Sequence, residues 1–176
     1  MSLAVVTSRA LDGLSAPEVQ VEVQLANGLP SFTLVGLADT EVKESRERVR
    51  AALQQSGFGF PHNKRITVNL APADLPKDSG RFDLPIALGI LAAAGVIEPA
   101  ALAPYEFAGE LSLGGELRPV RGALALALAM RQAGSARTLV LPADSAAAAA
   151  LVPGQPVRAA HHLAQVVQAL LPGDAA

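Results

Sequence analysis

The sequence predicts an α/β (α+β) domain, and three observations support this fold class. Near the N-terminus, runs such as VQVEVQL alternate apolar and polar residues, which is typical of half-buried strands. Further along, apolar segments with helical spacing alternate with short strand-like runs. Hydrophobic residues make up 51% and charged residues 17% of the 176 residues, which is enough for one packed core and excludes wholesale disorder.

The N-terminal half is expected to contain strands interrupted by one helix and followed by another. Turn residues separate the expected strands, which are 2–9, 17–26, 31–37 and 65–70. The helices are expected at about 40–56 and 82–94. Asp39 or Thr40 can cap the first helix, and Gly57 can stop it.

The C-terminal half alternates short strands and helices. A hairpin around Gly114-Gly115 is expected, with strands at 107–111 and 116–118. Asp144 can cap a short helix that is rich in alanine, a strong helix former. The remaining elements are helices at 120–133 and 162–171 and strands at 138–141 and 157–159. We expect a single domain over 1–172, with sub-lobes at about 1–104 and 105–172, and a tail at 173–176.

Composition excludes several kinds of site. The chain has no cysteine, which removes disulfides, zinc thiolates and thiol nucleophiles. Its three histidines, His62, His161 and His162, share no helix face with a carboxylate at ligand spacing, so no metal site is expected. No G-x-x-x-x-G-K-[ST] loop is present, so we expect no ATP binding. The apolar run 84–97 contains Pro85 and is too short to span a membrane, so a cytoplasmic protein without a secretory signal is expected.

The stretch ADLPKDSGRFDLPIAL at 73–88 joins a polar loop to an apolar helix. Such a loop can cradle a phosphate, hold a nucleophile or turn the chain. Ser79 could be the nucleophile of a Ser–Lys hydrolase, with N–H groups at the helix start forming an oxyanion hole. The turn or capping role is the more common one for serine at such a position, and we favour it.

Three longer segments resemble the N-terminal domain of the bacterial ComM/YifB family of magnesium-chelatase-like AAA+ ATPases. They are GLPSFTLVGLAD, VKESRERVRAALQQSGFGFP and RITVNLAPADLPKDSGRFDLPIALGILAA, and the resemblance covers nearly the whole chain. It implies a fold like the protease domain of Lon, the ribosomal protein S5 domain 2-like fold. The family's competence member is a DNA branch-migration helicase that serves natural transformation and recombination.

The same resemblance implies that protease chemistry has been lost. Lon-type proteases carry PKDGPSAG, and when this is laid on PKDSGRFD the nucleophilic serine falls at Arg81. The catalytic lysine, which follows the segment 115–122, falls at Leu124. Arginine stays protonated and cannot attack a carbonyl, and leucine cannot accept a proton. We therefore expect no catalytic residue and no cofactor in this chain; ATP and Mg²⁺ would be held by an ATPase domain that this sequence does not contain.

Charge is unevenly distributed along the chain. Residues 40–81 hold eight basic and five acidic residues, a net charge of +3, although the whole chain has −2 and the remainder therefore −5. On the helix at 40–56, Val42, Val49 and Leu53 form an apolar stripe, and three cations share an arc beside it. Arg48 points elsewhere and can pair with Glu44. The candidate nucleic-acid-binding residues are Lys43, Arg46, Arg50, Lys64, Arg65, Lys77 and Arg81.

The expected partner is DNA, contacted through its phosphates without reading of bases, because few aromatic residues are available for stacking. A solvated helix face with ordinary salt bridges explains the same pattern about equally well. The resemblance adds two partners, the protein's own AAA+ domain and further copies in a hexamer. A Ser peptidase and a pure oligomerisation module are the alternative functions.

Overall fold

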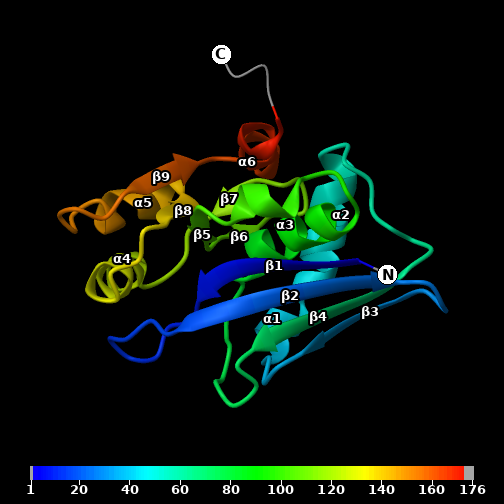
Figure 1. Cartoon of the computed structure of the whole chain (residues 1–176), viewed down its shortest axis with the longest axis horizontal. Helices are drawn as coiled ribbons and strands as arrows, with labels where there is room; N and C mark the ends of the chain where they lie inside the picture. Colours follow the sequence, from blue (N-terminus) through cyan, green and yellow to red (C-terminus); the bar gives the residue numbers. More distant parts are fainter. Residues whose placement is uncertain (1, 173–176) are drawn as a thin grey trace.

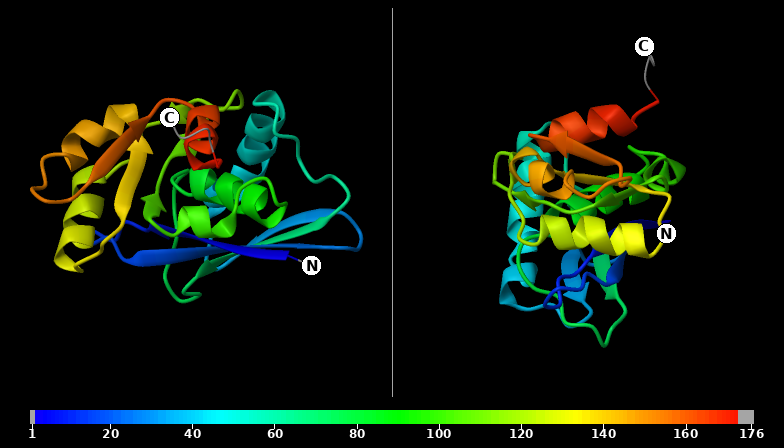
Figure 2. Two further views of the ribbon diagram at one scale, coloured as in Figure 1. Left: turned by 45° about the horizontal axis from the view of Figure 1, so that its top comes forward. Right: turned by 90° about the vertical axis from the view of Figure 1, so that its left-hand side faces the viewer.

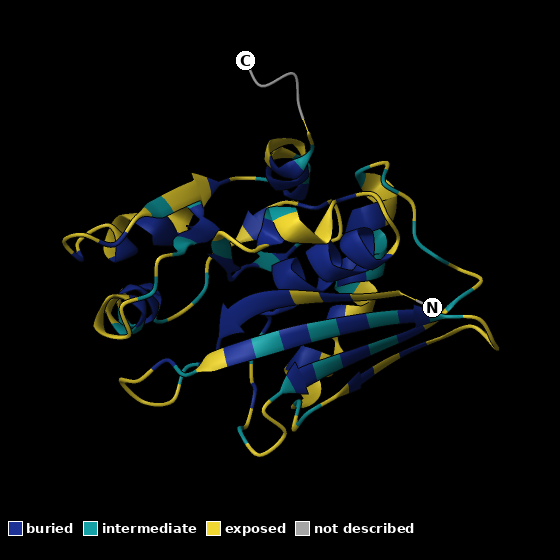
Figure 3. Ribbon diagram, viewed as in Figure 1, coloured by how far each residue is buried: buried dark blue, intermediate teal, exposed yellow. Residues whose placement is uncertain are grey.

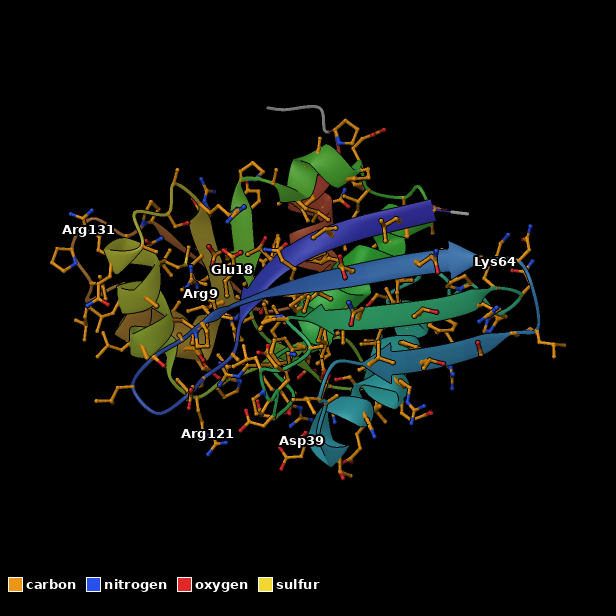
Figure 4. All side chains as sticks on the ribbon, turned by 60° about the horizontal axis from the view of Figure 1, so that its bottom comes forward. Arg9, Glu18, Asp39, Lys64, Arg121 and Arg131 are labelled. Carbon is orange, nitrogen blue, oxygen red and sulfur yellow. The ribbon has the colours of Figure 1, made fainter. Side chains whose placement is uncertain are left out.

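The computed structural model describes residues 2–172 and confirms the α/β fold class (Figure 1). A four-stranded sheet in the order β1-β2-β4-β3 forms one layer, and helices lie over one of its faces. Within residues 2–172, no helix or strand covers the other face of the sheet, which Figure 4 shows with that face forward. The tail expected at 173–176 lies outside the described residues.

The register of the sheet places alternate side chains in the core. β1 (Ser2–Arg9) and β4 (Arg65–Ala71) both pair antiparallel with β2 (Glu18–Ala26), and β3 (Ser31–Val35) runs parallel to β4 at the edge. Along β2, the residues Val19, Val21, Val23 and Leu25 are buried, and the polar residues between them are exposed or half-buried. The alternation in the sequence therefore predicts correctly which face is covered.

Helix α3 (Asp83–Ala93) is the centre of the core, because all of its residues are buried (Figure 3). It crosses β1 and β2, and Gly89 permits the close approach. A Cβ built at Gly89 would lie 2.5 Å from Cγ2 of Val23, which is too close for any real contact. The absence of a side chain at this position thus sets the distance between helix and sheet.

The helix expected at 40–56 is interrupted once. α1 (Thr40–Lys43) and α2 (Ser45–Gln55) are separated by Glu44, and Asp39 caps α1 by accepting a hydrogen bond from the N–H of Val42 at 2.8 Å. Helix α2 packs beside α3 over the same face of the sheet (Figure 2). Val49 and Leu53, from the predicted apolar stripe, are fully buried there.

The C-terminal half forms a parallel three-stranded sheet, a small hairpin and three helices. Its sheet has the order β5-β8-β9, the hairpin pairs β6 with β7, and a 3₁₀ turn η1 (Pro99–Leu102) precedes them. The strands are β5 (Tyr105–Phe107), β6 (Glu110–Leu111), β7 (Leu117–Arg118), β8 (Thr138–Pro142) and β9 (Val157–Ala160). The helices are α4 (Ala123–Gln132), α5 (Ala143–Ala149) and α6 (Leu163–Leu170).

Two expectations for this half were wrong in detail. The strand expected at 107–111 is two strands, because Phe107 belongs to β5 beside β8, whereas Glu110 and Leu111 pair with β7. Asp144 lies in the first turn of α5 and does not cap it, since the helix already begins after Pro142. The acidic side chain still lies at the positive end of the helix dipole.

The core is shared between the two halves of the chain. The larger hydrophobic cluster joins the four-stranded sheet, α2 and α3 to side chains of β5, β8 and α6, including Phe107, Val140 and Val167. A smaller cluster lies between α4, α5 and β8. No helix within residues 2–172 is long and apolar enough to cross a membrane.

Candidate functional site

The candidate cations on α1 and α2 face outward because the opposite side of these helices is buried. Val42, Val49 and Leu53 point into the core, which leaves Lys43 and Arg46 exposed and Arg50 half-buried. Arg46 and Arg50 both lie beside Phe32 of β3, the first by a hydrogen bond to its carbonyl and the second through the ring of Phe60.

Arg46 is held along the free edge of the sheet. Its Nε donates to the carbonyl of Lys43 at 3.1 Å, and its Nη1 donates to the carbonyl of Phe32 in β3 at 3.3 Å. Both acceptors are neutral, so these bonds position the guanidinium without cancelling its charge. The side chain is thereby fixed in an exposed place.

Arg50 lies over an aromatic ring. Its guanidinium carbon is 5.2 Å from the ring centre of Phe60, which lies 5.7 Å from the ring centre of Phe32. Arg50 also forms an exposed ion pair with Glu47 at 3.3 Å. A cation–π contact together with a surface ion pair keeps this side chain in place, and the pair partly offsets its charge.

Lys64 and Arg65 lie where β4 begins, at the end of the sheet opposite to Asp39 (Figure 4). Lys64 donates to the Oδ1 of Asn27 at 2.7 Å, again a neutral partner. Arg65 is exposed and points to the uncovered face of the sheet, because the next residue, Ile66, points into the core. Its aliphatic part passes Gly28, where any side chain would collide with it.

These five residues, which we call the basic surface, are Lys43, Arg46, Arg50, Lys64 and Arg65. Among the described residues, only Arg50 of this set has a carboxylate within salt-bridge distance. The members of the set lie on α1, along α2, whose eleven residues span about 16 Å at 1.5 Å per residue, and at the start of β4, where Arg65 points to the sheet face opposite to the helices. The set is therefore mostly unneutralised, although Glu41, Glu44 and Glu47 are exposed on the same helices.

Lys77 and Arg81 do not belong to this surface. Each is only 1% exposed, so the expectation that both line an open cationic surface was wrong. Lys77 donates its ammonium hydrogen bond to the carbonyl of Pro72, and burial lowers the pKa of this lysine. The strand-like contact between Ala38 and Lys77 draws the loop inward, which sequence periodicity does not reveal.

Arg81 ties the loop before α3 to the segment before α4 through hydrogen bonds of its guanidinium. Its Nη2 donates to the carbonyl of Arg121 at 2.8 Å, and its Nε donates to Oγ of Ser79 at 3.3 Å. Its Nη1 is buried and has no hydrogen-bond partner among the described residues. Burial lowers the pKa of Arg81, and the nearby Asp78 opposes this effect.

A cavity of about 350 Å³ opens beside this loop. Its lining consists of Glu41, Ser79, Gly80, Arg81, Glu110, Pro119, Val120 and Arg121. Ser79 has a positive φ of 65°, and its Oγ accepts from the backbone N–H and Nε of Arg81. Ser79 is therefore a turn residue, as favoured from the sequence, although it does not cap α3, whose N-cap is Phe82.

Leu124, which the resemblance to Lon-type proteases puts at the position of the catalytic lysine, lies apart from this cavity. Leu124 is on α4, is 43% exposed and does not line the cavity. The contact between Arg81 and Arg121 nevertheless brings the loop next to the start of α4. The two segments expected to carry the dyad are thus neighbours, and neither position holds a group that can act as nucleophile or base.

The sequence analysis missed a buried ionic network beneath the loop. Asp83, fully buried, accepts from Nε of Arg48 at 2.6 Å, from the N–H of Leu111 at 3.0 Å and from Oγ of Ser45. Burial raises the pKa of Asp83, against the lowering effect of these bonds, and the bond to Asp83 raises the pKa of Arg48. The pairing of Arg48 with Glu44 was therefore wrong, because Arg48 turns inward to a carboxylate on α3.

A second buried pair joins the two halves of the chain. Arg9 at the end of β1 donates to Glu106 in β5 at 2.7 Å and to the carbonyl of Ala16 at 2.9 Å. Arg137 lies 3.6 Å from the same carboxylate. A lone acid within an apolar run, as at Asp83 and Glu106, was the available signal, because such a residue requires a partner.

The described residues contain no group of three or more histidine and acidic side chains that could hold a metal ion. His62 lies 3.4 Å from the side-chain amide of Gln54. His162 caps α6 by accepting from the N–H of Ala164 at 3.0 Å, and its Nε2 lies 2.9 Å from the carbonyl of Gly114. His162 therefore has a structural role at the junction of hairpin and helix.

Comparison with known proteins places this arrangement in a family. A family model described as subunit ChlI of Mg-chelatase matches residues 21–145. The chain is 52% identical over 170 residues to the competence protein ComM of Haemophilus influenzae, with 97% of this chain and 33% of the relative covered. It is 48% identical to a protein named YifB from Salmonella typhimurium and 46% identical to YifB from Escherichia coli, each over 173 residues.

These matches cover 98% of this chain in both YifB proteins and 33% of each relative, so the chain spans about one third of the length of the curated relatives. The resemblance to ComM and YifB proteins is thereby confirmed over nearly the whole chain. The family model covers well over half of the residues, including α2, α3, the loop before α3 and the cavity beside it. The chain belongs to the family of the ChlI subunit of Mg-chelatase.

Proposed function

We propose that this chain is a non-catalytic N-terminal domain of a ComM/YifB-type AAA+ ATPase and that its basic surface contacts DNA phosphates. In the longer protein, a separate AAA+ domain would bind ATP and Mg²⁺ and drive DNA branch migration as a hexamer. The 52% identity to a competence protein supports this assignment to DNA processing.

The observation that carries the proposal is the lack of counter-charge on the basic surface. Four of its members, Lys43, Arg46, Lys64 and Arg65, have no carboxylate within salt-bridge distance in the described part of the chain. A solvated helix face with ordinary salt bridges would pair such residues. Cations held by neutral acceptors remain available to phosphate oxygens.

The expected contact is independent of base sequence. Phe32, the nearest aromatic residue on β3, is buried, and Phe60 is half-buried and covered by Arg50. Stacking on bases needs an exposed ring, so the surface is suited to phosphates alone. Affinity should be weak for one copy, roughly 10⁻⁴ to 10⁻⁶ M at physiological salt, and assembly of several copies would increase it.

Peptidase activity is disfavoured by the loop itself. Arg81 occupies the nucleophile position and is held on the Arg121 carbonyl, and the lysine position is an exposed leucine. Ser79 Oγ has Arg81 as its only described hydrogen-bonding partner, so no general base is hydrogen-bonded to it in residues 2–172. An arginine in this place cannot form an acyl intermediate.

Assembly is the second candidate function, and an apolar groove favours it. A cavity of about 190 Å³ lies between α6 and the strands β5, β8 and β9. Tyr105, Phe107, Val166 and Leu170 are among the side chains that line it. Apolar grooves of this kind are typical places for contact with another domain or subunit.

The proposal is tested by fluorescence anisotropy with a labelled oligonucleotide at low salt. A basic-surface variant, Lys43→Gln/Arg46→Gln/Arg65→Gln, is compared with a control of equal charge loss, Arg118→Gln/Arg131→Gln/Arg158→Gln, at exposed positions elsewhere. We expect the basic-surface variant to bind at least about tenfold more weakly than the control, a difference of about 1.4 kcal/mol. Equal binding by both variants would leave assembly as the leading function. Circular dichroism checks that both remain folded.

A further inference from the structure

The cavity beside the loop before α3 is lined by a buried arginine, Arg81, which has no salt bridge in the described chain and is influenced by the charge of the nearby Asp78 only at longer range. Arg81 is 1% exposed, and no carboxylate among residues 2–172 lies within salt-bridge distance of it. Its Nη1 is buried without a hydrogen-bond partner in the same part of the chain. A buried donor that is left unsatisfied is costly, and such groups are uncommon in folded proteins.

Two other arginines that reach the interior, the half-buried Arg48 and the buried Arg9, are each paired with a buried carboxylate, whereas Arg81 is not. Arg48 donates to the carboxylate of Asp83, and Arg9 donates to that of Glu106. Within residues 2–172, the side chain of Arg81 has only a carbonyl and a hydroxyl as hydrogen-bond partners, both neutral. An acceptor from outside the chain would complete the bonding of this guanidinium.

Further donors face the same cavity. Ser79 Oγ receives hydrogen bonds from Arg81, so its own hydroxyl hydrogen can be directed to another acceptor. Arg121 is exposed, lines the cavity and has no described carboxylate partner for its side chain. Two guanidiniums and one hydroxyl suit the several oxygens of a phosphate group, which accepts from more than one direction.

Carboxylates, which accept hydrogen bonds, form another part of the cavity wall. Glu41 and Glu110 also line the cavity, and Glu110 packs directly against Gly80, where any side chain would collide with it. Glu110 is close enough to Arg48 to raise the pKa of that arginine, so its charge is partly balanced from α2. These carboxylates would repel a bare polyanion but would accept hydrogen bonds from hydroxyl groups.

We propose that this cavity binds the phosphate monoester of a hydroxylated compound, with the phosphate on Arg81, Arg121 and Ser79 and the hydroxyls on Glu41 and Glu110. Its volume of about 350 Å³ fits a sugar phosphate or one terminal nucleotide. The site is distinct from the basic surface, and binding here does not depend on the function proposed for that surface. Its residue Arg81 is at the position where the resemblance to Lon-type proteases puts the nucleophilic serine.

The test titrates the full chain with ribose 5-phosphate, with ribose and with inorganic phosphate, observed by ¹H–¹⁵N NMR and calorimetry. We expect ribose 5-phosphate to shift the amides of Ser79, Gly80 and Arg121 and to bind more tightly than either component. Arg81→Met should weaken binding at least about tenfold. Arg121→Met changes an exposed residue, so its fold is secure, and it should also weaken binding.

A second arm identifies the source of the phosphate. A trinucleotide with a 5′-phosphate is compared with the same trinucleotide carrying a 5′-hydroxyl. Tighter binding of the phosphorylated trinucleotide than of ribose 5-phosphate would support a nucleic-acid end as ligand, whereas similar affinities would support a free sugar phosphate. The proposal is wrong if ribose 5-phosphate leaves these amides unshifted, or if Arg81→Met and Arg121→Met bind it as tightly as wild type does.

The basic-surface variant separates this inference from the proposed function. Lys43→Gln/Arg46→Gln/Arg65→Gln leaves every residue of the cavity lining in place. It should bind ribose 5-phosphate as wild type does while losing affinity for longer oligonucleotides. Loss of ribose 5-phosphate binding in this variant would contradict a separate site.

Discussion

At the scale of single residues, three arginines near α3 differ in whether an acidic group neutralises their charge. Arg48 is neutralised by a fully buried carboxylate, Arg46 is exposed and fixed by carbonyls, and Arg81 is buried with one nitrogen unsatisfied. Of these three, only Arg48 has its charge neutralised by a carboxylate of the described chain. The other two leave positive charge that a ligand or polyanion can use.

The first prediction concerns Asp83. Replacing it by alanine removes the partner of Arg48 and leaves the N–H of Leu111 and the hydroxyl of Ser45 unsatisfied. We expect the free energy of unfolding to fall by about 2–4 kcal/mol, because the groups that bonded to Asp83 would stay buried without a hydrogen-bonding or ionic partner. Urea denaturation measures the change.

The control for Asp83 is Glu47, whose pair with Arg50 is exposed. Glu47→Ala should change the free energy of unfolding by less than about 1 kcal/mol. Similar losses in both variants would show that the network beneath the loop does not stabilise the fold.

The second prediction concerns the pH dependence of stability at Lys77. Burial lowers the pKa of this lysine, so in the window between the folded pKa and about 10.4 the unfolded chain binds more protons than the folded one. Stability from this group therefore rises as pH rises through that window. We expect the stability of wild type relative to Lys77→Met to increase from neutral to alkaline pH, measured by urea denaturation at several pH values. A difference that is constant with pH would contradict this.

At the scale of the elements, helix α3 and its neighbour α2 determine where charges and cavities lie. The third prediction tests the packing of α3 on the sheet. Gly89→Ala adds a methyl group that would lie 2.5 Å from Val23, so it should destabilise the fold by about 1–3 kcal/mol although alanine favours helix formation by about 1 kcal/mol.

Gly114→Ala is the matched control for Gly89, because a Cβ at Gly114 would have only Ser112 Oγ nearby, at 3.9 Å. We expect its thermal unfolding temperature to stay close to that of wild type. If Gly89→Ala is equally well tolerated, the separation of α3 from the sheet does not depend on the missing side chain.

The sequence predicts those features that depend on residues close together in the chain, and it does not predict contacts between residues far apart in the chain. Strand alternation and the apolar stripe of Val42, Val49 and Leu53 are local patterns, and both are confirmed. The pairing of Arg48 with Asp83 joins residues 35 apart, and that of Arg9 with Glu106 joins residues 97 apart, which no local pattern encodes. Burial of Lys77 and Arg81 likewise depends on how the loop folds back on the segment after β3 and on Arg121, just before α4.

At the scale of the whole molecule, the two candidate surfaces are separate. The basic surface consists of cations on α1, α2 and the start of β4, whereas the apolar groove lies beside α6 in the other half of the chain. The cavity at Arg81 lies between the loop before α3 and the start of α4.

The fourth prediction is that the isolated chain neither hydrolyses ATP nor cleaves unfolded protein. No Walker A loop is present in the sequence, and the resemblance to Lon-type proteases puts Arg81 and Leu124 where those enzymes have their catalytic serine and lysine. Phosphate release and casein cleavage should both stay at the level of a buffer control. Peptidase activity that disappears in Ser79→Ala would show that the loop has been aligned wrongly with the proteases.

Whether the basic surface contacts phosphates is measured by the salt dependence of oligonucleotide binding. Each phosphate contact contributes about −0.9 to the slope of log K against log salt for double-stranded DNA. Compared with wild type and with the Arg118→Gln/Arg131→Gln/Arg158→Gln control, the Lys43→Gln/Arg46→Gln/Arg65→Gln variant should show a slope shallower by about 2–3, because fewer counterions are released. An unchanged slope in that variant, or no binding by wild type at low salt, would contradict the account.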